Sequence, residues 1–140
     1  MSILRIIAIA AALVGLADSI YLTVHHYTAE PVPCSLIDGC ETVLTSPYAE
    51  IAGVPLAVLG AAAYFAAFSL ALLAIFGNRT AWTLFGVQAV VMAIFTSWLI
   101  YLQAAVIGAF CQFCLLSAIT TYILLTAYII SLLVRQKNPV

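Results

Sequence analysis

Residues 81–134 read AWTLFGVQAVVMAIFTSWLIYLQAAVIGAFCQFCLLSAITTYILLTAYIISLLV and include no charged side chain. A membrane-spanning helix needs about 20 consecutive apolar residues, so this stretch is too long for one span and right for two. Gly108 falls between two apolar halves, and glycine is a common turn residue. We therefore expect a hairpin at residues 103–110, between spanning helices at about 81–103 and 109–134.

Two more apolar stretches precede this region. Residues 3–24 hold only Arg5 and Asp18 as charged residues, and residues 55–76 hold none. No small-x-small cleavage site follows the first stretch, so we expect a retained helix and not a cleaved signal peptide. The chain has 6% charged residues, against about 25% in soluble domains. We predict one all-α integral membrane domain, residues 1–140, built as a four-transmembrane-helix bundle.

The basic residues predict how this bundle is oriented. With four spans, every lysine and arginine falls on one side of the membrane: Arg5, Arg79, Arg135 and Lys137. Basic residues mark the cytoplasmic side, so we expect a multi-pass protein of the plasma membrane with both termini in the cytoplasm. The net charge of −1 offers no basic surface, and no nucleic-acid partner is expected.

The one long polar segment, residues 25–53, is then expected in an outer loop, on the same side as the hairpin. Asp38 followed three residues later by Glu41 resembles a capping box, which predicts a short helix within this loop. Ser46 and Pro47 are expected to end that helix, because the residue before a proline disfavours the helical conformation.

All four cysteines fall on the outer side in this topology. Cys34 and Cys40 lie in the outer loop, and Cys111 and Cys114 lie where the last helix begins. Two cysteines three residues apart on a helix share one face, and a helix N-terminus stabilises a thiolate. Disulfides that close such short loops stabilise a fold little, which favours redox chemistry for both pairs.

Two cysteine pairs on one side indicate an electron relay. The pair in the loop can reach a soluble protein, and the pair at the helix can reach a carrier in the lipid bilayer. Disulfide exchange moves two electrons, and the two-electron carrier dissolved in a membrane is a quinone. We therefore predict a thiol–disulfide oxidoreductase. Two other classes stay open, namely a scaffold with structural disulfides and a transporter or channel, whereas no metal site is expected at the membrane edge.

The order and spacing of several motifs resemble the vitamin K epoxide reductase family, in its small bacterial and archaeal members. The matching residues run through most of the chain: Gly15-x-x-Asp18-Ser19-x-Tyr21-Leu22-Thr23, Cys34 and Cys40 with Ser46, Gly53-Val54-Pro55-Leu56-Ala57-x-x-Gly60 with Tyr64, Tyr101-Leu102, and Cys111-x-x-Cys114. The resemblance implies a four-helix bundle around a quinone, with the short loop helix lying over it as a lid.

The resemblance also implies a direction of electron flow. A thioredoxin-like (DsbA-like) protein, expected to act in trans, would reduce Cys34 and then Cys40. Cys111 would receive the electrons, and Cys114 would deliver them to the quinone. Ser46 matches a loop serine that supports this site in the family. Such a protein would support disulfide formation in exported proteins.

Further site residues are implied by position. The quinone would be of the menaquinone, ubiquinone or vitamin K type, and its expected contacts are Leu59, Tyr64, Leu99 and Ile107. Animal members of the family carry a tyrosine where Ala118 stands. This departure favours disulfide generation over reduction of vitamin K epoxide or quinone, which is the alternative activity.

Asp18 lies inside the first predicted helix, and a carboxylate within a membrane span is a functional candidate. It is expected to serve either as a hydrogen-bond or proton-transfer site, or as a buried carboxyl bonded to Ser19, Tyr21 or the backbone. In the transporter alternative it would be an ion site.

Overall fold

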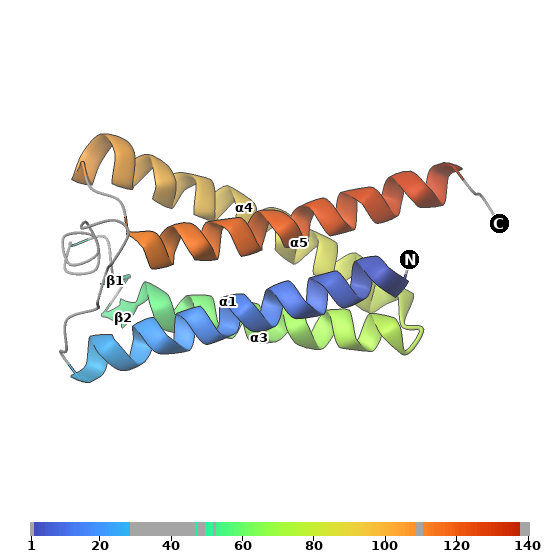
Figure 1. Ribbon diagram of the computed structural model, residues 1–140, viewed down its shortest axis with the longest axis horizontal. Helices are drawn as coiled ribbons and strands as arrows, with labels where there is room; N and C mark the ends of the chain where they lie inside the picture. Colours follow the sequence, from blue (N-terminus) through green and yellow to red (C-terminus); the bar gives the residue numbers. More distant parts are fainter. Residues whose placement is uncertain (1, 29–46, 48–49, 52, 109–110, 138–140) are drawn as a thin grey trace.

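The computed structural model describes residues 2–28, 47, 50–51, 53–108 and 111–137 (Figure 1). Its long helices are α1 (Ser2–Thr28), α3 (Leu56–Ile75), α4 (Arg79–Tyr101) and α5 (Gln112–Lys137). A π-helix, η2 (Leu102–Ile107), continues α4. In this part of the chain four helical stretches are long and apolar enough to cross a membrane. The predicted all-α membrane bundle is therefore confirmed, and the protein is a multi-pass membrane protein.

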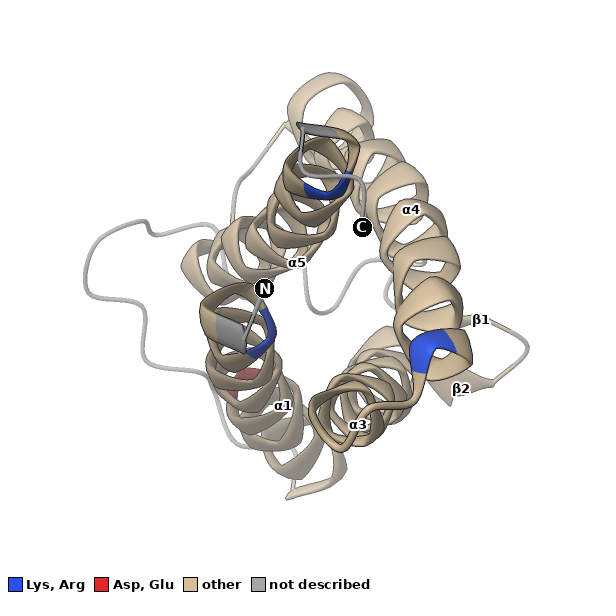
Figure 2. Ribbon diagram, turned by 90° about the vertical axis from the view of Figure 1, so that its right-hand side faces the viewer, with Lys and Arg blue, Asp and Glu red and all other residues tan. Residues whose placement is uncertain are grey.

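The four helices form a closed ring. Helix α1 packs against α3 and α5, and α4 completes the ring by packing against the same two helices. Figure 2 shows this ring along the bundle axis, with the lysine and arginine positions at the end nearest the viewer. We call this end, where α1 begins and α5 finishes, the basic end. The opposite end, where α1 finishes and α5 begins, is the cysteine end.

Small residues bring the helices close together in the core. Helices α1 and α3 contribute buried alanines to one cluster: Ala8, Ala11, Ala12, Ala67, Ala71 and Ala74. Gly15 of α1 leaves room for the ring of Tyr64, and a side chain at this position would collide with that ring. Small residues at helix contacts permit the close approach on which packing within membranes depends.

A group of side chains ties the helices together at the basic end. The guanidinium of Arg5 donates from Nη1 to the carbonyl oxygen of Ala74 at 2.8 Å, and lies 5.4 Å from the ring centre of Trp82. The indole of Trp82 donates to Ser131 Oγ at 2.9 Å. These contacts link one residue from each of the four helices, which fixes this end of the bundle.

Helix α1 is longer than the sequence predicted. We expected it to end at residue 24, but it continues to Thr28, so the predicted start of the outer loop at residue 25 is wrong. The imidazole of His26 lies 3.0 Å from a carboxylate oxygen of Glu50, and the rings of Tyr21 and His25 are 4.4 Å apart. These contacts stabilise an additional turn although its residues are polar.

The segment between α1 and α3 ends in a small hairpin. Strands β1 (Glu50–Ile51) and β2 (Val54–Pro55) pair antiparallel, with Gly53 at a φ of 81° in the turn. This hairpin was not predicted. The predicted lid helix lies outside the described residues.

The predicted outer hairpin after α4 is shorter than expected. Helix α4 begins at Arg79, two residues before the predicted start, because the side chain of Asn78 caps it by accepting from the N–H of Ala81 at 3.0 Å. Its continuation η2 carries the helical rod to Ile107, beyond the predicted end at residue 103. Gly108 then turns the chain with a φ of 75°.

Helix α5 is displaced toward the C-terminus relative to its predicted range. It begins at Gln112 and not at residue 109, and it continues beyond residue 134 to Lys137. Its start is fixed by Cys111, whose carbonyl oxygen accepts the first helical hydrogen bond, from Leu115 N at 3.0 Å.

Candidate functional site

The two motif cysteines sit at the first turn of α5. The Cys111 sulfur accepts hydrogen bonds from the backbone N–H groups of Phe113 and Cys114. This is the pattern of an N-cap residue, which satisfies the free N–H groups at a helix start. Cys114 is therefore the third residue of the helix, and its thiol hydrogen-bonds the Cys111 sulfur. Both side chains are free thiols, and Cys111 is fully buried.

The surroundings of Cys111 favour its thiolate. Cys111 precedes the spanning segment Gln112–Gln136. The hydrogen bond from the Cys114 thiol has the largest effect, and the N–H groups of Cys114 and Phe113 add to it, whereas burial opposes ionisation. Together they lower the pKa of Cys111 to about 7. Because the thiolate is the reactive form in disulfide exchange, this sulfur is prepared for redox chemistry at neutral pH.

Gln103 of η2 holds the backbone of Cys111 in place. Its side chain is buried, and its Oε1 accepts from the Cys111 N–H at 3.0 Å. Its carbonyl oxygen accepts from Gly108 N at 2.9 Å. A role for Gln103 was not predicted from the sequence. Its one available signal was an amide in an apolar stretch, eight residues before the first motif cysteine.

An aromatic contact joins the end of α1 to the cysteine motif. The ring of Tyr21 lies 5.2 Å from that of Phe113, between the two motif cysteines in sequence. Tyr21 also contacts His25 one turn further along α1. The cysteine pair is thus fixed on two sides, by α1 through aromatic packing and by η2 through a hydrogen bond.

Asp18 is buried on α1 near the same site. Its side chain is 7% exposed, and neither carboxyl oxygen has a hydrogen-bond partner among the described residues. The expected alternative of a carboxyl bonded to Ser19, Tyr21 or the backbone therefore finds no support in this part of the chain. Its charge interacts with both motif cysteines.

Tyr64 crosses the bundle from α3 to α5. Its ring is 1% exposed, and its hydroxyl lies 2.8 Å from Ser117 Oγ, 2.7 Å from Thr120 Oγ1 and 2.9 Å from Thr121 Oγ1. It also donates to the Ser117 carbonyl oxygen at 2.6 Å. We call the hydroxyls of these four residues the hydroxyl cluster. It lies one to two helical turns along α5 from Cys114.

The other residues expected at the quinone are spread over several elements. Leu59 on α3 is 42% exposed, and Leu99 on α4 and Ile107 on η2 are half-buried. Tyr64 alone points into the core. These contacts stay predictions. Cys34, Cys40 and Ser46 lie outside the described residues.

The family of the chain follows from one comparison together with this architecture. Residues 6–129 match the family model described as vitamin K epoxide reductase family. The match covers α3 and α4 in full, most of α1 and α5, and the positions of both cysteine pairs. Proteins of this family are membrane oxidoreductases that use quinones in general. The chain, a membrane bundle with a cysteine pair at the start of its last helix, therefore belongs to the vitamin K epoxide reductase family and is an oxidoreductase.

Proposed function

We propose that this protein oxidises a thioredoxin-like (DsbA-like) protein and passes the electrons to a membrane quinone. Electrons enter at Cys34 and Cys40 of the loop and move to Cys111 and Cys114. The observation that carries the proposal is the thiol pair at the first turn of α5, in which one sulfur is stabilised as a thiolate. A partner oxidised in this way introduces disulfides into exported proteins.

The described residues fit the chemistry that a quinone supplies when bound, namely acceptance of two electrons and two protons. The Cys111–Cys114 dithiol gives up two electrons and two protons when its disulfide forms. The carboxyl of Asp18, which has no hydrogen-bond partner among the described residues, interacts electrostatically with both sulfurs. Contacts at Leu59, Tyr64, Leu99 and Ile107 remain part of the proposal, as does a menaquinone, ubiquinone or vitamin K type of carrier.

The distribution of charge supports an outward-facing cysteine end. All lysine and arginine residues lie at the basic end, and basic residues mark the cytoplasmic side of membrane proteins (Figure 2). We place the protein in the plasma membrane with both termini inside. Its cysteines then face the oxidising compartment, where disulfides persist.

Ala118 favours disulfide generation over reduction of vitamin K epoxide. It is buried one turn after Cys114 and carries no hydroxyl. Animal members of the family have a tyrosine at this position. Epoxide reduction stays the alternative activity, and the experiment below tests it with the epoxide as a second acceptor.

Anaerobic mixing tests the proposal. Purified protein in detergent is mixed with a reduced thioredoxin-like protein and a quinone, and quinone absorbance is followed. We expect quinone reduction in the wild type and its complete loss in Cys114→Ala, because one sulfur cannot form the disulfide. Ser69→Ala is the matched control, since among the described residues this hydroxyl donates within its own helix, to Phe65 O. A folded wild type that reduces none of several quinones contradicts the proposal.

A further inference from the structure

Asp18 is the only acidic residue in the four spans. It is more than nine-tenths buried, yet both of its carboxyl oxygens lack a hydrogen-bond partner among the described residues. An unpaired polar group inside a protein is destabilising, and ionisable groups within membranes mark proton or ion pathways. Packing alone does not account for an aspartate here, because an apolar residue would fill this space without that cost.

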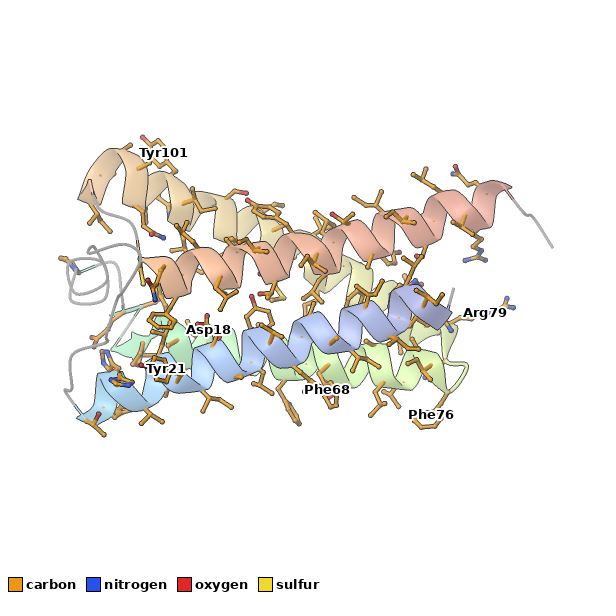
Figure 3. The ribbon with its side chains drawn as sticks, viewed as in Figure 1. Asp18, Tyr21, Phe68, Phe76, Arg79 and Tyr101 are labelled. Atoms are coloured by element: carbon orange, nitrogen blue, oxygen red, sulfur yellow. The ribbon has the colours of Figure 1, made fainter. Side chains whose placement is uncertain are left out.

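The neighbours of Asp18 on α1 show which way it faces. Residues three apart share a helix face, so Asp18 lies between Gly15 and Tyr21. Gly15 contacts the ring of Tyr64, whereas Tyr21 contacts Phe113 of the cysteine motif. Figure 3 shows Asp18 and Tyr21 on the half of α1 nearest the start of α5. Asp18 is therefore placed between the hydroxyl cluster and the thiol pair.

The carboxyl is also close enough to the sulfurs for its charge to act on them. Asp18 interacts electrostatically with Cys111 and Cys114. The other titratable groups around this space, among the described residues, are Tyr64 from α3 and Tyr21 on α1 itself. The Tyr64 hydroxyl is already engaged with the hydroxyl cluster. Asp18 is the one group here with free acceptor atoms.

We propose that Asp18 is the proton acceptor for the Cys111–Cys114 dithiol. The dithiol loses its first proton when the Cys111 thiolate forms and its second when the S–S bond closes, and the two sulfurs together lose two electrons to the oxidant. Asp18 takes these protons one at a time and passes each to the oxidant, so that it is unchanged after turnover. With a quinone as oxidant, the product is a quinol. The identity of the physiological oxidant, a quinone, rests on the proposed function. The role of Asp18 itself concerns residues of the bundle alone.

Two substitutions test the role. Asp18→Asn keeps the size and polarity of the side chain but removes the acceptor, and Asp18→Glu restores a carboxyl. In single-turnover oxidation of the reduced pair by quinone we expect Asp18→Asn to be about 100-fold slower, the usual size of a lost acid–base group. Asp18→Glu should recover part of this rate, and Ser69→Ala should equal the wild type. Equal rates in Asp18→Asn and wild type would overturn the proposal.

A second readout separates this role from a structural one and needs no quinone. Alkylation of Cys111 should be at least as fast in Asp18→Asn as in the wild type, because loss of a nearby negative charge favours the thiolate. Slow oxidation combined with unimpaired alkylation supports proton acceptance. If both reactions slow together and Asp18→Glu restores neither, Asp18 is structural and the proposal fails.

Infrared difference spectra supply an independent observation. We compare reduced protein with protein oxidised by a soluble reagent that accepts electrons but no protons. Because no quinone is present to take the proton from Asp18, we expect the carbonyl band of a protonated carboxylic acid to appear on oxidation. The band should be missing in Asp18→Asn. A wild type that shows the band change but reduces no quinone would refute the proposed function while retaining the proton role. A wild type that reduces quinone without the band change would refute only the proton role.

Discussion

At the scale of single residues, Cys111 combines two tasks that are usually assigned to different side chains. It caps α5, because its sulfur accepts hydrogen bonds from backbone N–H groups that would otherwise lack partners. The same sulfur is the redox-active group. The two tasks support each other, because a thiolate accepts these hydrogen bonds more strongly than a thiol does. A serine at this position would cap the helix but carry no electrons.

The thiolate of Cys111 leads to a pH-dependent prediction. Its pKa is lowered to about 7, so the reactive fraction rises through neutral pH and falls about tenfold for each pH unit below that value. Alkylation of the Cys111 peptide, followed by mass spectrometry in a variant without Cys34 and Cys40, should follow this profile. In Cys114→Ala the profile should move to higher pH, because the strongest stabilising hydrogen bond is gone. A profile that stays in place would contradict the assignment of that bond.

At the scale of elements, the hairpin between η2 and α5 is held by one amide side chain. Gln103 accepts from the backbone of Cys111 through its side chain, and from Gly108 through its carbonyl oxygen. The π-helical turn directs this side chain toward the cysteine. π-Helical turns occur frequently at functional sites, and here the turn carries the residue that holds the Cys111 backbone.

Replacement of Gln103 tests this arrangement. Gln103→Leu leaves the buried Cys111 N–H without an acceptor, which we expect to cost about 1–3 kcal/mol of unfolding free energy. Spontaneous oxidation of the Cys111–Cys114 pair should also slow, because the first turn of α5 loses its fixed position. Gln103→Glu keeps an acceptor and should retain most of the oxidation rate. Denaturation in detergent and thiol titration provide the two measurements. Normal oxidation in Gln103→Leu would show that the bond does not position the site.

The sequence predicted the helices well and their ends less well. Hydropathy alone identifies four spans, because backbone groups in hydrocarbon must be satisfied within helices. The extra turn of α1 depends on Glu50, which lies 24 residues away from His26 in the chain, so no local pattern reveals it. The early start of α4 was readable from Asn78, a good N-cap residue, but was missed.

The candidate site likewise combines features that local sequence predicts with features that depend on distant residues. The pair at Cys111 and Cys114 follows from spacing and position. The links from Gln103 and from Tyr64 do not, since each joins residues from different elements that meet only after folding. Tyr64 was expected at the quinone, but its position in the hydroxyl cluster could not be derived from sequence. Asp18 stood out because it is charged, and the structure adds that its oxygens are free among the described residues.

At the scale of the whole molecule, the proposed electron path leads from the loop into the bundle. We expect Cys34→Ser to impair oxidation of a thioredoxin-like protein far more than oxidation of a small dithiol, because a small thiol reaches Cys40 directly. Cys111→Ser should abolish turnover with both reductants. The measurement is the rate of quinone reduction in each variant, with the thioredoxin-like protein and with the small dithiol as reductants. Equal losses in Cys34→Ser would contradict an entry role for this cysteine.

The placement of both sulfurs within one helical turn has a mechanical consequence. When electron exchange makes or breaks the disulfide of the α5 pair, the two sulfurs need only small side-chain rotations, and the helices that hold them need not shift. Side-chain rotations are among the faster motions of a protein, and two macromolecules need far longer to meet. The arrangement of the pair therefore lets the four helices stay in place while electrons pass between carriers that come and go.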